Sequence, residues 1–190
     1  MLDVFELEPA TTIHADESYI VSYPHLVSYF ASKATISAEE VVCGAHMVYG
    51  WMPTILDLYS NPTKLDLFGA AELLTKARYN GIVTDSELQG LAGLVNNSLV
   101  GASKLLHFIA PTQFAIWDSK VYAFVFNQKA HQYRISNINS YRKYLNILSD
   151  LQSNPRFDKF HNSINTKMGY KVSPIRALEV VMYLNAPDVV

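Results

Sequence analysis

The chain has 190 residues, a formal net charge of −2, one cysteine and 49% hydrophobic residues. This length and apolar content suit a single domain over residues 1–190, undivided or built from two lobes, and exclude a disordered chain. No uninterrupted apolar run reaches the roughly 18 residues that a membrane span needs, and the acidic start lacks the features of a signal peptide. We therefore expect a soluble, cytoplasmic protein with no membrane partner. The lone Cys43 excludes an internal disulfide framework and a zinc cage of several thiolates.

Charge is distributed unevenly along the chain. Residues 1–100 carry four Lys or Arg and twelve Asp or Glu, whereas residues 101–190 carry eleven and five. Such an asymmetry is one signature of a nucleic-acid partner. The basic residues of the second half are also interleaved with aromatic ones. A solvated face on amphipathic helices explains the same pattern, so both interpretations stay open.

The apolar residues recur mostly at helical spacing, which predicts an all-α fold. Ser37 and Glu40 form a capping box that begins one helix, and Asn80-Gly81 is a typical helix end. Thr84 to Ser86 caps the next helix, and proline opens the last two. In chain order, we expect helices within residues 19–33 (with Pro24 near the start), 37–50, 53–59, 65–79, 87–95, 99–109, 118–126, 140–151, 155–165 and 174–184, with a loop over 127–138.

The densest group of chemically useful residues lies between residues 96 and 121. A polar turn at Asn96-Asn97-Ser98 leads into a helix that carries Lys104, and a proline-containing connector then precedes Asp118. This layout, over about residues 85–127, resembles the hairpin segment of the helix-hairpin-helix DNA glycosylases, the superfamily of endonuclease III and 8-oxoguanine glycosylase.

The matching positions are Gly101 to Lys104 and Trp117 to Val121. The sequence departs from the family at Ala102, which stands where a second glycine is usual. It also lacks the iron–sulfur cysteines of some members, and the 14 residues from Lys104 to Asp118 are a short step for the family.

The resemblance implies a compact all-α DNA glycosylase that acts on double-stranded DNA without a cofactor. Such an enzyme flips out a damaged or modified base and cleaves its N-glycosidic bond, leaving an abasic site. It would serve DNA repair or defence against modified viral DNA. The resemblance makes Asp118 and Lys104 the catalytic pair. The alternative is a non-catalytic, all-α nucleic-acid-binding or adaptor module.

The chemistry of base excision needs what these two residues supply. Breaking an N-glycosidic bond develops oxocarbenium character at the sugar, which the Asp118 carboxylate would stabilise. Lys104 has apolar neighbours, so its amine is expected to have a lowered pKa and to attack C1′, with lyase nicking of the abasic product. A helix cap at Asp118, and a solvent-facing or phosphate-binding side chain at Lys104, are the alternative roles.

Other residues are candidates for holding the base and the DNA. A flipped base needs an aromatic or apolar slot with polar groups at its edge, and these side chains offer that composition: His46, Tyr49, Trp51, His107 and Trp117. The hairpin and the basic second half supply the candidate DNA contacts: Asn97, Ser98, Gly101, Ser103, Lys120, Arg134 and Arg142. Structural roles in a helical core or surface suit the same residues. The six histidines include no His-x-x-x-His pair, so we expect no metal site, and we expect a monomer.

Overall fold

The computed structural model describes residues 2–59, 61 and 64–188 of the chain. Within these residues the fold is all-α, as the periodicity predicts, and contains no strand beyond two isolated bridges. No helix among them is long and apolar enough to cross a membrane. The helices are α1 (Val4–Leu7), the 3-10 helix η1 (Glu8–Ala10), α2 (Ser18–Ala31), α3 (Ala38–Trp51), α4 (Leu67–Asn80), α5 (Asp85–Leu94), α6 (Leu99–Ile109), α7 (Ser119–Phe126), α8 (Gln132–Ile135), α9 (Ile138–Gln152), α10 (Phe157–Met168) and α11 (Pro174–Leu184).

Side-chain caps fix the helix ends that the sequence marks. The Ser37 amide donates to the Glu40 carboxylate at 2.8 Å, and the Ser37 hydroxyl accepts from the Glu40 amide, so the predicted capping box is present. Thr84 forms a second capping box at the start of α5. Gly81 ends α4 in the left-handed region with φ of 65°, which glycine adopts without a steric penalty.

The predicted helix over residues 53–59 is wrong. The Asn96 side chain instead accepts from the Asp57 amide at 2.7 Å and donates to the Ile55 carbonyl at 2.8 Å. Leu58 also pairs with Val95 in an isolated bridge. The backbone of this segment therefore bonds to the α5–α6 turn rather than to itself.

The sequence patterns also miss three short helices. α8 lies inside the stretch predicted as loop, and α1 and η1 lie before the first predicted helix. Each has only three or four residues, too few for a helical period to show in the sequence.

Pro24 lies in the middle of α2 rather than near its start. Because proline has no N–H, the Ile20 carbonyl loses the donor that a regular helix would give it. The Tyr170 hydroxyl donates to this carbonyl at 2.7 Å, and the Trp51 indole N–H donates to the neighbouring Tyr19 carbonyl at 3.0 Å. The irregularity in α2 is thereby used to attach α3 and the segment before α11.

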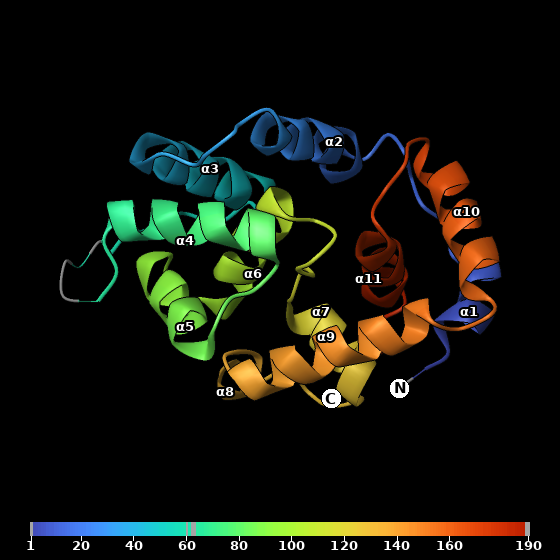
Figure 1. Cartoon of the computed structure of the whole chain (residues 1–190). Helices are drawn as coiled ribbons and strands as arrows, with labels where there is room; N and C mark the ends of the chain where they lie inside the picture. Colours follow the sequence, from blue (N-terminus) through green and yellow to red (C-terminus); the bar gives the residue numbers. More distant parts are fainter. Residues whose placement is uncertain (1, 60, 62–63, 189–190) are drawn as a thin grey trace.

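The helices form two groups, which Figure 1 shows on either side of the molecule. One group contains α3 to α6, and the other contains α7 and α9 to α11 with α1 beside them. α2 packs on α3 and α6. Arg156 of the second group pairs with Asp3 at 2.9 Å and Glu6 at 3.0 Å, and Lys167 pairs with Glu8 at 2.8 Å. The first residues of the chain are thus joined to its last helices.

Two helical glycines provide a matched test of this packing. A Cβ at Gly101 would lie 2.1 Å from the Tyr49 hydroxyl oxygen, whereas a Cβ at Gly93 would meet no atom within 4 Å. We expect Gly101→Ala to lower the free energy of unfolding by about 1–3 kcal/mol through overpacking. Gly93→Ala should raise it by up to about 1 kcal/mol, because alanine is the better helix former. Urea denaturation measures both, and equal effects at the two positions would contradict this account of Gly101.

Candidate active site

Helix α6 is buried around nearly its whole circumference and carries a single lysine. Residues 101–103 and 105–109 are all buried, whereas Lys104 is only partly buried. Lys104 lines a pocket of about 810 Å³. Its ammonium group makes no hydrogen bond or ion pair with any residue that the structure describes, and it lies 5.7 Å from the centre of the Trp51 ring. The amine therefore faces the pocket without a bonded partner.

Two buried side chains of α6 hold the connector that follows it. The Ser103 hydroxyl accepts from the Trp117 amide at 3.1 Å and donates to the Val100 carbonyl at 2.8 Å. His107 Nδ1 lies 2.7 Å from the Phe114 carbonyl oxygen. A carbonyl can only accept, so Nδ1 carries the proton and Nε2 accepts from the Tyr23 hydroxyl at 2.8 Å. Because Ser103 bonds to Trp117, the next residues along the chain, Lys104 and Asp118, come to the same pocket.

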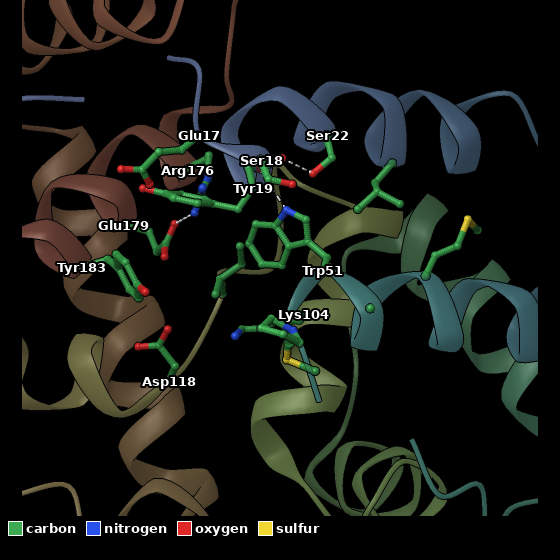
Figure 2. Close-up of a pocket in the computed structure, with 16 residues that line it drawn as sticks. Glu17, Ser18, Tyr19, Ser22, Trp51, Lys104, Asp118, Arg176, Glu179 and Tyr183 are labelled. Carbon is green, nitrogen blue, oxygen red and sulfur yellow. Dashed lines mark hydrogen bonds and ion pairs between the residues drawn. The ribbon is translucent and has the colours of Figure 1, made fainter. Parts of the chain in front are cut away.

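Asp118 caps α7 with one carboxylate oxygen and leaves the other free. Its Oδ1 accepts from the Val121 amide at 2.9 Å, which is the N-cap bond that the sequence indicates. Its Oδ2 accepts no hydrogen bond from the described residues. Figure 2 shows the Asp118 carboxylate and the Lys104 amine pointing into the same space from opposite sides. Capping and a role in the pocket are therefore compatible in one side chain.

The surroundings of Lys104 favour its neutral amine. Burial lowers the pKa of Lys104, while the negative charges of Asp118 and Glu179 act in the opposite direction and Arg176 adds to the lowering. Burial outweighs the attraction because neither carboxylate is in ion-pair contact with the ammonium. A larger share of this amine is neutral near pH 7 than of an exposed lysine, as nucleophilic attack requires.

Aromatic side chains form one wall of the pocket. Trp51, at the end of α3, packs edge-on against Tyr19 with ring centres 6.3 Å apart, and Tyr19 lies 6.5 Å from Tyr183. Trp51 is held in place by its indole bond to the Tyr19 carbonyl. These rings give the pocket an aromatic wall, and the face of a single ring is a surface on which a planar ligand can stack.

Next to these rings, the pocket contains a buried ion pair on α11. Arg176 and Glu179 are both buried, line the pocket, and pair with each other one turn apart. Burial raises the pKa of Glu179 to about 7, and the Asp118 charge adds to this, although Arg176 opposes it. The motifs of the sequence indicated neither residue. Two charged residues three apart in an otherwise apolar stretch, residues 174–184, were the available signal.

Of the five side chains predicted to hold a base, only Trp51 lines the pocket. Tyr49 is buried and donates to the Val95 carbonyl at 3.1 Å, and Trp117 is fully buried with its indole N–H bonded to Ile135. His107 is fully buried between Tyr23 and Phe114, and His46 is exposed outside the pocket lining. These four positions correct the predicted substrate-binding set.

The predicted DNA contacts fall into two kinds. Gly101 and Ser103 are buried and Ser98 caps α6, so these three residues have structural roles. Asn97 is exposed at the hairpin turn, and Lys120 is exposed with its amine 4.4 Å from the centre of the Tyr183 ring at the pocket.

The two arginines of this set are already bonded within the chain. Arg134 donates to the Lys129 carbonyl at 2.9 Å. Arg142 pairs with Asp85 at 3.0 Å. Asn97 and Lys120 are thus the predicted contacts whose side chains are most accessible.

Comparison with known proteins found no matching family model, no matching curated protein and no matching solved structure. Among the residues that the structure describes, no group of three or more His, Cys, Asp or Glu could hold a metal ion. The site is therefore interpreted from its own geometry and chemistry.

The raised pKa of Glu179 predicts a measurable effect of pH on stability. Between pH 4.5, its ordinary value, and about 7, the folded state holds a proton that the unfolded state has lost. This stabilising contribution is complete below pH 4.5 and is lost as the pH rises through about 7. Glu179→Gln removes this pH-dependent contribution. As the pH increases from 4.5 to about 7, the free energy of unfolding of the variant should therefore rise relative to that of wild type, by on the order of 1–3 kcal/mol.

Urea denaturation at a series of pH values measures this difference. His107, with a pKa lowered to about 3 by burial, gives the opposite slope below pH 6.5, but it is present in both proteins and cancels. Glu72→Gln, at an exposed position of α4, is the matched control for the removal of a carboxylate. A flat difference for Glu179→Gln would refute the raised pKa.

Proposed function

We propose that this protein is a DNA glycosylase of the helix-hairpin-helix type, which extrudes a damaged or modified base from double-stranded DNA and cleaves its N-glycosidic bond. The observation that carries this proposal is that Lys104 and Asp118 line one pocket with an aromatic wall. The two residues come from the second helix of the hairpin and from the cap of the following helix. A module that only bound nucleic acid would not need an unpaired amine, Lys104, and a carboxylate oxygen without a hydrogen-bond donor, Asp118 Oδ2, in the same pocket.

Asp118 would act on the sugar. As the bond between C1′ and the base breaks, positive charge develops on the ring, and the free Oδ2 offers a negative charge to stabilise it. The cap bond to Val121 fixes the orientation of the carboxylate in advance. The interaction is therefore preorganised for the charge that appears in the transition state.

Lys104 would act as the nucleophile. Its neutral amine attacks C1′, the electron pair of the glycosidic bond leaves with the base, and the base takes up a proton. Loss of the proton from the resulting ammonium, followed by ring opening, gives an imine between Lys104 and the sugar. The free position of the amine and its lowered pKa support this route over direct attack by water.

The DNA would contact the edge of the pocket at the start of α7. Lys120, in the first turn of α7, is exposed beside Tyr183, which lines the pocket. A cation at this rim is placed to contact a phosphate next to the extruded nucleotide. Asn97 at the exposed hairpin turn is the second proposed contact.

Asp118→Asn tests the carboxylate without removing the cap. Asparagine caps helices as well as aspartate does, so the variant should keep the wild-type structure. Its dissociation constant for DNA should stay within a few fold of the wild-type value. Release of the base should fall by about 10²-fold or more because charge stabilisation is lost. The assay incubates DNA containing normal, damaged or hypermodified bases and then uses alkali to reveal abasic sites. Full activity in this variant would exclude Asp118 as the catalytic carboxylate.

Borohydride trapping tests Lys104. Reduction of the imine would link wild-type protein covalently to DNA, and Lys104→Ala should lose both the adduct and strand nicking. Lys143→Ala, at an exposed position of α9, is the matched control and should trap as wild type does. If wild type releases bases but never traps, water is the nucleophile. If Lys104→Ala still traps, another amine is responsible.

A further inference from the structure

Arg176 presents two N–H groups to which no described residue bonds. Its Nη1 is paired with Glu179, but neither Nε nor Nη2 has a hydrogen-bond partner, although both atoms are buried. The side chain is 2% exposed and lines the pocket. Its guanidinium lies over the rings of Tyr23 at 4.8 Å and Trp51 at 5.8 Å. Buried donors without acceptors are costly, which is the situation expected where a ligand supplies the acceptors.

The two free donors share one edge of the guanidinium. The Nε–H and Nη2–H bonds point in nearly the same direction, so together they bind two neighbouring acceptor atoms as a fork. The carboxylate of Glu179 bonds to Nη1, the nitrogen that lies outside this edge. The fork therefore offers two adjacent donors to a ligand.

The charges around the fork favour a neutral ligand over an anion. The charge of Arg176 is already offset by its ion pair with Glu179, and the carboxylate of Asp118 lines the same pocket. A phosphate or carboxylate at the fork would therefore gain little net attraction. A planar neutral ring needs no such attraction and also stacks on Trp51.

We propose that Arg176 selects the extruded base by its hydrogen-bonding edge, which must present two adjacent acceptors. This inference rests on the proposed glycosylase function. Cytosine presents O2, N3 and the N4 amino group in that order, and guanine presents N7, O6 and N1–H. Thymine and uracil alternate acceptor, donor and acceptor, and adenine follows its N7 acceptor with a donor. The substrate base is thus of the cytosine or guanine type, with any modification outside that edge.

The base reaches the fork by moving a side chain of the wall. Figure 2 shows Tyr19 beside Arg176, and Tyr19 is the second residue of α2, where its ring is only partly buried. Its contacts with Trp51 and Tyr183 are edge and tilted contacts that a stacked base can replace. Rotation of the Tyr19 side chain about its own bonds would leave the backbone of α11 unchanged.

Binding to uncleavable DNA tests the selection separately from catalysis. Four DNA duplexes each carry one 2′-fluoroarabino nucleotide, which resists cleavage of its glycosidic bond. The base on this nucleotide is cytosine, guanine, thymine or adenine, and the complementary strand has an abasic spacer opposite it. Fluorescence anisotropy should give dissociation constants about tenfold lower for cytosine and guanine, since a bidentate pair is worth about 1–3 kcal/mol. Arg176→Lys keeps the charge but loses the fork, and should bind all four within about twofold. Arg156→Lys, at an exposed arginine of the N-terminal ion pairs, should keep the preference.

Titration of the wild-type protein with free nucleosides gives a second, variant-independent measurement. The Arg176 Nε–H resonance should shift with cytidine and guanosine but not with thymidine or adenosine. Equal affinity for the four duplexes, or no shift with cytidine and guanosine, would overturn the assignment. If bases are released without this preference, the selection fails and the glycosylase function stands. If the nucleosides shift the resonance as expected but no DNA yields abasic sites, the selection stands and the glycosylase function fails.

Discussion

The hydrogen bond from the Trp117 amide to the Ser103 hydroxyl is the interaction on which the pocket depends. It holds the segment between α6 and α7 at a fixed position along α6. The hydrogen bond between His107 and the Phe114 carbonyl holds the same segment one helical turn further along α6. Lys104 directly follows Ser103, and Asp118 directly follows Trp117. Their side chains therefore face each other across the pocket without being in contact. A shift of one residue on either side would turn one of them into the core. Side chains buried behind the pocket thus set the geometry in front of it.

The pocket concentrates charge that the rest of the fold has to tolerate. Lys104 has no ion pair within the described chain, and the Arg176–Glu179 pair leaves two donors without acceptors. Replacing such groups by apolar ones often stabilises a protein, because desolvation of an ion can exceed the attraction it gains. The large aromatic core around Trp117, Tyr141 and Tyr144 supplies apolar burial close by. Unfavourable electrostatics in one cavity of a well-packed domain are typical of a functional site rather than a structural one.

Local sequence patterns predicted most of the helices. The site was predicted less completely, because it depends on contacts between residues that are far apart in the sequence. Caps such as Ser37, Thr84 and Asp118 act within one helical turn, so the sequence marks those helix ends directly. Residues 53–59 are organised by Asn96, some 40 residues away, and no local pattern shows that bond. Lys104 and Asp118 were predicted from the resemblance over residues 85–127, and the structure places both at one pocket. His107 and Trp117 have suitable chemistry, but their partners lie in the core, and Arg176 meets the site only through tertiary packing.

The separation of the pocket walls along the chain has a consequence for biosynthesis. The walls come from residues 17–53, 104–118 and 176–183, so α6 leaves the ribosome well before α11. A chain that has been made only as far as α10 lacks Arg176, Glu179 and Tyr183, so its pocket has neither the buried ion pair nor the third aromatic ring. The pocket is therefore complete only after α11 has been synthesised and has packed on α7.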